Sequence, residues 1–109
     1  MKRGDIVIVA APGDYGKPRP AVVIQTDALT ELGSRSIALC LMSSLPLKAP
    51  LFRIGLEPTE FNGLKKSSQI MVEKLFTVPR EKIVQIIGRL TDDEIVQLNR
   101  TLSFVIGLG

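Results

Sequence analysis

The chain has 109 residues, of which 45% are hydrophobic and 23% charged, enough apolar material for one domain with a buried core. The formal net charge is +3 and the pI is about 9.3, a mildly basic balance that permits a nucleic-acid partner without requiring one. Histidine is absent, which excludes a Ser-His-Asp triad, a histidine-based metal site and a two-histidine ribonuclease mechanism. We therefore expect a single domain over residues 1–109.

The cysteine content and the first residues both indicate a cytoplasmic protein. Cys40 is the only cysteine, so no internal disulfide can form, which fits a reducing compartment. It lies in the apolar segment 37–42 and should pack as a small hydrophobe. Residues 1–5 do not resemble a signal peptide, and no segment approaches the roughly 20 apolar residues of a membrane span. We expect no membrane partner.

The first two expected strands flank a loop. Residues 6–10 form a continuous, mainly β-branched run, which predicts a buried strand. Residues 11–16 contain a proline, two glycines and Asp14, which predicts a loop. The second strand should run from about Arg19 to Thr26.

The beginning of that second strand carries the strongest functional signal. Pro18 and Pro20 bracket Arg19, and each proline disfavours helix in the residue before it, so Lys17 and Arg19 should be extended. A guanidinium held at the start of a strand, just after a glycine-containing loop, suits recognition of a phosphate or a carboxylate. A solvated arginine at the start of an edge strand is the alternative that local sequence leaves open.

The middle of the chain alternates short strands with loops. One loop carries Lys48 between two prolines, and Ser43 and Ser44 end the strand before it. The expected elements are one helical turn (28–32), a third strand (36–42), a loop (45–50) and a fourth strand (51–54).

The last third predicts more strands and then a helix. The expected segments are a strand (67–72), an extended stretch (76–78), one turn (80–82), a strand (83–87) and a helix beginning after Thr91. Thr91 and Glu94 fit a capping box, and Gly107 is a good stop. Apolar residues recur between them at helical spacing. We expect a mainly β fold, a closed or nearly closed small barrel finished by one C-terminal helix.

Several polar side chains are candidates for chemistry, because loops on one rim of a small barrel converge. The candidates are Asp14, Lys17, Arg19, Ser43, Ser44, Arg53, Lys65, Lys66 and Glu73. Cleavage of RNA by its own 2′-hydroxyl needs a base, an acid and a cation over the developing charge, and it needs no metal. Taken singly, Asp14 is also a typical turn residue, and the lysines and Glu73 are also typical solvated charges.

The ordered set of motifs resembles the MazF/PemK/Kid-type toxins of bacterial toxin–antitoxin systems. The motifs are Lys2-Arg3-Gly4-Asp5-Ile6-Val7, Gly13-Asp14-Tyr15-Gly16-Lys17, Arg19-Pro20-Ala21-Val22-Val23-Ile24, residues 67–78 and Ile87-Gly88-Arg89-Leu90. The resemblance covers nearly the whole chain. It implies a Src-homology-like β-barrel of the CcdB/PemK type, a homodimer, and sequence-specific cleavage of single-stranded RNA without a metal or cofactor. It also implies 2′,3′-cyclic phosphate and 5′-hydroxyl ends, and a cognate antitoxin whose acidic segment occupies the RNA groove.

The resemblance also implies roles for individual residues. Arg19 matches the catalytic arginine, Ser43 the position usually held by a catalytic threonine, and Asp14 and Glu73 two acidic positions of the site. The expected RNA-binding residues are Lys17, Ser44, Lys48 and Arg53. The chain departs from the pattern at Asp14, where many members have the longer glutamate, and at Met71, where some have arginine.

Two other functions remain open on the sequence. A CcdB-like gyrase poison shares the fold, but that family relies on a C-terminal end containing tryptophan, and this chain has no tryptophan. In a non-catalytic nucleic-acid-binding barrel, Arg19 and Lys48 would contact phosphates only. The RNA sequence that is recognised cannot be derived from the chain, because it depends on loop shape and base pockets.

Overall fold

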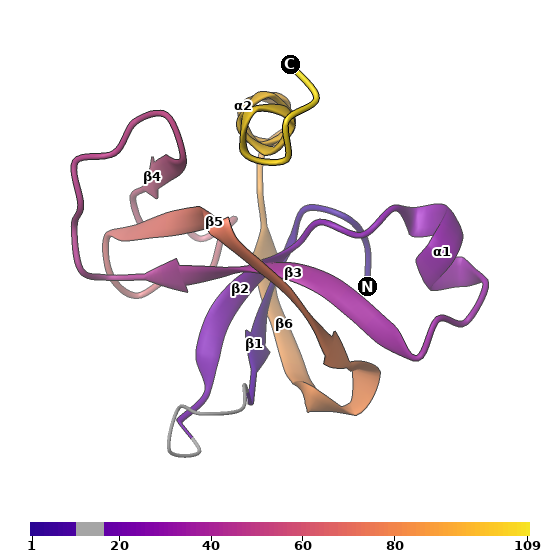
Figure 1. The fold of residues 1–109 in the computed structure, drawn as a ribbon. Helices are drawn as coiled ribbons and strands as arrows, with labels where there is room; N and C mark the ends of the chain where they lie inside the picture. The colour runs from indigo at the N-terminus through magenta and orange to yellow at the C-terminus, as the bar shows by residue number, and fades with distance from the viewer. Residues whose placement is uncertain (11–16) are drawn as a thin grey trace.

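The computed structural model describes residues 1–10 and 17–109 and is mainly β (Figure 1). Its elements are β1 (Asp5–Val9), β2 (Arg19–Val23), α1 (Asp27–Glu31), β3 (Ser36–Ser43), β4 (Arg53–Leu56), β5 (Ser68–Pro79), the 3-10 turn η1 (Arg80–Lys82), β6 (Ile83–Arg89) and α2 (Asp92–Val105). None of the helices in this described part of the chain is long and apolar enough to cross a membrane.

The strands form one antiparallel sheet in the order β4-β5-β3-β2-β1-β6. The long strand β5 pairs with β3 on one side and with β4 on the other, and register shifts in the β3–β5 and β1–β6 pairs let the sheet coil. The edges of the sheet are β4 and β6. The predicted mainly β fold with a C-terminal helix is confirmed.

Loop 57–67 bridges the two edges of the sheet. The backbone N–H of Arg89 in β6 donates to the carbonyl of Phe61 in this loop at 3.1 Å. The buried Asn62 side chain organises the loop, because its Oδ1 accepts from the N–H groups of Thr59 and Leu64 and its Nδ2 donates to the Glu57 carbonyl. The coiled sheet is therefore closed by loop packing instead of by another ladder.

Two glycines permit this close approach. A Cβ at Gly88 would lie 2.3 Å from the carbonyl carbon of Asn62, and one at Gly63 would lie 2.0 Å from the carbonyl oxygen of Ile87. Gly63 also has φ +67°, which side chains rarely adopt. Backbone therefore packs on backbone where the loop meets β6.

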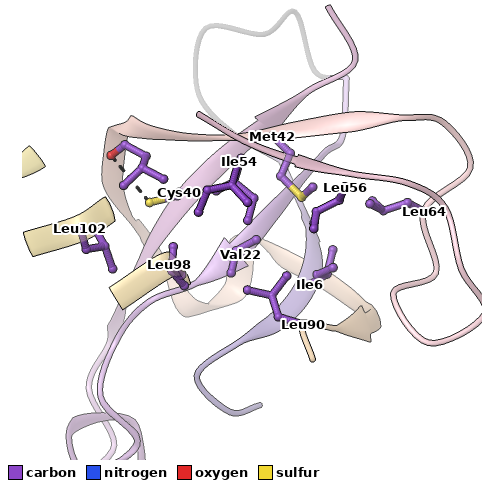
Figure 2. Close-up of a cluster of buried hydrophobic side chains, with 12 residues drawn as sticks. Ile6, Val22, Cys40, Met42, Ile54, Leu56, Leu64, Leu90, Leu98 and Leu102 are labelled. Carbon is purple, nitrogen blue, oxygen red and sulfur yellow. Dashed lines mark hydrogen bonds between the residues drawn. The ribbon is translucent and has the colours of Figure 1, made fainter. Parts of the chain in front are cut away.

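The main core lies between the coiled sheet and α2 (Figure 2). Its buried members are Ile6, Val22, Cys40, Met42, Ile54, Leu56, Leu64, Ile70, Val72, Leu90, Leu98 and Leu102. Leu98 and Leu102 come from α2 and point into the sheet, as the helical spacing predicted. The predicted capping box is present: Thr91 Oγ1 accepts from the Glu94 N–H, and the Glu94 carboxylate accepts from the Thr91 N–H.

Several predicted boundaries differ from the structure by one or two residues, and three differences are more informative. The second strand ends at Val23 instead of Thr26, because Thr26 already caps α1. The fourth strand begins at Arg53, since the N–H groups of Phe52 and Arg53 both donate to the Ala49 carbonyl in a turn. The two extended pieces expected between 67 and 78 form one continuous strand, β5.

Candidate active site

A groove with a volume of ≈ 700 Å³ opens where β2, β3, β6 and loop 57–67 meet. The polar and charged side chains that line it are Lys17, Arg19, Ser43, Ser44, Lys65, Lys66, Ser68 and Gln85. Apolar residues such as Ile8, Met42 and Leu64 line the rest. The structure thus brings together six of the nine candidates from the sequence: Lys17, Arg19, Ser43, Ser44, Lys65 and Lys66.

The sheet register explains why Arg19 and Ser43 meet. β2 and β3 pair antiparallel, with Ala21 opposite Leu41. Continuing this register by two residues on each strand places Arg19 opposite Ser43. Arg19 is the first residue of β2 and Ser43 the last of β3, as the proline-flanked sequence and the strand-end serines predicted.

The Ser43 hydroxyl is oriented by the backbone that follows it. The N–H of Leu45 donates to Ser43 Oγ at 3.0 Å, so this hydroxyl accepts one hydrogen bond from its own chain. A serine hydroxyl has one hydrogen to donate in addition to its two acceptor lone pairs. The Ser43 hydrogen is therefore available for a ligand in the groove.

The charge of the groove suits an anion. Lys17, Arg19, Lys65 and Lys66 all lie on its lining, and none of the lining residues that the structure describes is acidic. Clustered cations in a concave site attract phosphates and raise their local concentration. We infer that the groove accepts a polyanion.

Arg53 and Glu73 form an ion pair that does not line this groove. The Arg53 Nε and Nη2 atoms both donate to the Glu73 carboxylate, with Nη2 at 2.6 Å from Oε2, and the Arg53 side chain is only 10% exposed. Arg53 in β4 lies opposite Met71 in β5. Some members of the family that the sequence resembles carry an arginine two residues before this acidic position, where this chain has Met71. Here the guanidinium that contacts Glu73 comes instead from Arg53 on the neighbouring strand.

The ion pair fixes the protonation state of Glu73. Partial burial raises the pKa of the Glu73 carboxyl, but the hydrogen bonds and charge of Arg53 lower it by more, and the net pKa lies below its ordinary value of 4.5. A carboxyl with a lowered folded-state pKa stabilises the fold above its unfolded pKa, and this contribution disappears as the pH falls through the folded value.

This ion pair predicts an acid-dependent stability. We expect the free energy of unfolding of the wild type to fall below pH 4.5, and that of Glu73→Gln to fall less, because the amide does not titrate. Urea titrations between pH 7 and pH 3 measure the difference. Glu31→Gln, at an exposed position of α1, is the control and should follow the wild type. Parallel pH profiles for Glu73→Gln and the wild type would refute the linkage.

The other predicted site residues lie elsewhere. Lys48 is exposed in loop 44–52 and does not line the groove. Asp14 lies outside the described residues. The catalytic and RNA-binding roles of all eight predicted site residues stay predictions, including those of the four that line the groove.

Gln85 lines the groove but is not among the sequence candidates, whereas Lys65 and Lys66 are candidates for which the sequence predicts no specific role. Taken singly, Lys65 and Lys66 are also typical solvated charges, and the packing of loop 57–67 on β6 brings them to the site. A single glutamine inside the apolar strand 83–87 was the available signal for Gln85.

Cys40 has no part in the site. It is fully buried in the main core (Figure 2), and its Sγ lies 4.0 Å from the Val72 carbonyl oxygen. Burial raises the pKa of the Cys40 thiol to about 12, with a smaller contribution from the Glu73 charge, so the thiol stays protonated. Among residues 1–10 and 17–109, no group of three cysteine or acidic side chains is placed to hold a metal ion.

The sequence matches a known family and known proteins over its whole length. The model of a family described as "PemK-like, MazF-like toxin of type II toxin-antitoxin system" matches residues 2–106. The chain is 38% identical to a probable endoribonuclease MazF of Mycolicibacterium smegmatis, over 100% of this chain and 99% of that protein. It is 28% identical to endoribonuclease MazF9 of Mycobacterium tuberculosis, over 99% and 98% of the two chains.

The fold is similar to that of solved structures. One is a mycobacterial endoribonuclease in complex with its cognate antitoxin, with a TM-score of 0.84 and 14% identity, covering 100% of this chain and 97% of that one. Another is a MazE–MazF complex from Deinococcus radiodurans, with a TM-score of 0.79 and 16% identity over the same shares of the two chains.

Proposed function

The chain belongs to the family of PemK-like, MazF-like toxins of type II toxin–antitoxin systems, and on this premise we propose that it is an endoribonuclease toxin. It cleaves single-stranded RNA, mRNA included, at a specific sequence and without a metal. The single observation that carries the proposal is the cationic groove in which Arg19 and Ser43 lie at the adjoining ends of two paired strands.

The proposed reaction uses the RNA's own 2′-hydroxyl. Its oxygen attacks the adjacent phosphorus and its proton passes to a base, while the bond to the 5′-oxygen breaks and that oxygen takes up a proton. The products are a 2′,3′-cyclic phosphate and a 5′-hydroxyl. Asp14 or Glu73 is the proposed carboxylate for proton transfer; of the two, Glu73 is paired with Arg53 and does not line the groove.

Arg19 supplies the positive charge and Ser43 the hydrogen-bond donor that this reaction needs. The pentavalent phosphorane carries extra negative charge on its equatorial oxygens, and the Arg19 guanidinium stabilises it as the charge develops. The Ser43 hydroxyl, which already accepts from the Leu45 N–H, donates its hydrogen to the same phosphate.

Comparison of RNA with DNA tests this mechanism directly. The purified protein should cut a single-stranded RNA that contains its site and leave a DNA of the same sequence intact, because the DNA lacks the attacking 2′-hydroxyl. Cleavage of both strands would overturn the mechanism. Cleavage of neither would favour the alternatives, a gyrase poison or a non-catalytic binding barrel, which no specific observation supports.

Lys65 and Lys66, which line the groove, predict how the affinity for RNA depends on salt. The double variant Lys65→Ala, Lys66→Ala removes two proposed phosphate contacts. The plot of the logarithm of the RNA association constant against the logarithm of the salt concentration should therefore become less steep, its slope smaller in magnitude by roughly 1.4 on single strands. Fluorescence anisotropy with a 2′-O-methyl RNA, which cannot be cleaved, measures it. Lys82→Ala, at an exposed position outside the groove, should leave the slope unchanged. An unchanged slope in the double variant would mean that neither lysine contacts the RNA backbone.

We propose that a cognate antitoxin neutralises the toxin by placing an acidic segment in the same groove. The absence of acidic side chains from its described lining supports this, because a carboxylate-rich peptide would meet four cations and, among the described lining residues, no carboxylate. An affinity-tagged protein purified from its native cells should retain the antitoxin, and adding RNA should compete with it. Antitoxin binding that survives removal of Lys65, Lys66 and Arg19 together would contradict a shared groove.

A homodimer is the proposed assembly. Exposed apolar side chains on α2, directly after it and on β5 support it: Phe104 and Ile106 are 50% and 52% exposed, and Leu75 is 41% exposed. Sedimentation equilibrium should give twice the chain mass of 11.9 kDa, and a persistent monomer at micromolar concentration would refute the dimer. Because mRNA is the proposed substrate, we place the activity in the cytoplasm, where cell fractionation should recover the protein.

A further inference from the structure

Gln69 holds the loop that follows Ser43 with a pair of reciprocal hydrogen bonds. The N–H of Leu47 donates to Gln69 Oε1 at 3.0 Å, and Gln69 Nε2 donates to the Leu47 carbonyl at 2.9 Å. A glutamine carboxamide has the same donor and acceptor as a peptide group. The side chain therefore pairs with the Leu47 backbone as a neighbouring strand would. We call these two hydrogen bonds the Gln69 clamp.

The position of Gln69 in the sheet connects this clamp to the groove. In the β3–β5 register Gln69 lies opposite Ser43, and on its other side it pairs with Gly55 of β4. Gln69 thus lies beside Ser43 in the sheet, and its side chain bonds to Leu47, which is four residues after Ser43 in the chain. Gln69 itself does not line the groove, whereas Ser43, Ser44 and Leu45 do.

One further hydrogen bond, from the Leu45 N–H to Ser43 Oγ, holds the chain between Ser43 and Leu47. The Leu45 N–H orients the Ser43 hydroxyl, and Pro46, next in the chain, has no N–H to offer. The path of Leu45 is therefore fixed at one end by Ser43 Oγ and at the other by the Gln69 clamp. Leu45 and Leu47 have exposed side chains, 76% and 48%, so apolar packing contributes little to holding the segment.

We propose that Gln69 is a positioning residue for RNA cleavage. Its carboxamide holds residues 44–47 in place, and through the Leu45 N–H it keeps the Ser43 hydroxyl aimed into the groove. The inference rests on the proposed endoribonuclease function. Displacing a catalytic group by about 1 Å can lower a rate by about 100-fold, so a clamp that never contacts RNA can control the rate.

The first test uses Gln69→Ala with Gln97→Ala, at an exposed position of α2, as the matched control. We expect Gln69→Ala to lower the single-turnover cleavage rate by roughly 10- to 100-fold. Its affinity for 2′-O-methyl RNA should stay within about threefold, because no groove cation is removed. Gln97→Ala should match the wild type in both. A Gln69→Ala rate within twofold of the wild type would overturn the proposal, as would a rate loss wholly explained by a smaller folded fraction.

The second test uses Gln69→Glu, which has the same shape. An ionised carboxylate still accepts from the Leu47 N–H but cannot donate to the Leu47 carbonyl, whereas a protonated one can do both. The cleavage rate of Gln69→Glu relative to the wild type should therefore rise as the pH is lowered toward 5, while that of Gln69→Ala stays flat. A flat ratio for both variants would contradict the clamp, since a merely structural loss has no such pH profile.

A third readout separates this inference from the proposed function. Hydrogen exchange measures the Leu45 and Leu47 amides whether or not the protein cleaves RNA. Faster exchange at both amides in Gln69→Ala, in a protein whose wild type cleaves RNA, supports the proposal. A wild type that cleaves no RNA overturns the proposed function and with it the positioning role, even if the amides respond. Unchanged exchange in the variant overturns the clamp alone.

Discussion

Arg19→Ala should lower the rate of RNA cleavage by roughly 10²- to 10³-fold, the effect of removing one preorganised donor from a site that stabilises developing negative charge. Arg19 is the first residue of β2 and lines the cationic groove opposite the end of β3. Its side chain is exposed and outside both buried clusters, so the fold should persist. Single-turnover cleavage of a labelled RNA measures the rate, and circular dichroism the fold.

Two further variants make the Arg19 result specific. Arg100→Ala, at an exposed position of α2, removes the same charge away from the groove and should cleave as the wild type does. Arg19→Lys keeps the charge but loses the planar fork of the guanidinium, so it should recover only part of the rate. Cleavage by Arg19→Ala at the wild-type rate would remove Arg19 from the catalytic machinery.

Gly88→Ala should destabilise the fold by about 3 kcal/mol, the upper part of the usual range for overpacking. The new methyl group would lie 2.3 Å from the Asn62 carbonyl carbon and 2.5 Å from the Phe61 carbonyl oxygen, and both are backbone atoms that cannot rotate away. For a domain of about this size, the melting temperature should fall by roughly 12 °C or more. Thermal unfolding followed by circular dichroism measures the shift.

Gly55→Ala is the matched control for Gly88→Ala. Gly55 is also a strand glycine, in β4, but a Cβ there would meet no atom within 4 Å. We expect it to melt within a few degrees of the wild type or slightly above it, since alanine restricts the unfolded chain more than glycine does. Equal melting temperatures for the two variants would mean that loop 57–67 does not pack on β6 as described.

The parts of the site that were predictable from sequence depend on local backbone rules. Pro20 disfavours helix at Arg19, and Pro18 does so at Lys17, whatever the rest of the chain does, and β2 begins at Arg19. Ser43 ends an apolar run, and the strand ends there as well. Antiparallel neighbours then bring these two strand ends together.

The rest of the site depends on contacts between residues far apart in the chain. Lys65 and Lys66 reach the groove only because Gly63 and Gly88 let loop 57–67 lie against β6. Arg53 pairs with Glu73 only through the β4–β5 register, which periodicity does not specify. The same limit explains the fourth strand: Leu51 and Phe52 have strand-like side chains, but their backbone belongs to a turn.

The most direct test of the account is to incubate the purified protein with a mixed single-stranded RNA in EDTA and to map the ends of the products. We expect cuts at one short sequence, each leaving a 2′,3′-cyclic phosphate and a 5′-hydroxyl, and the same cuts at a roughly 10²- to 10³-fold lower rate with Arg19→Ala. RNA that stays intact in EDTA but is cut after magnesium is added would contradict the metal-free mechanism. RNA that stays intact under both conditions would contradict the proposed function itself.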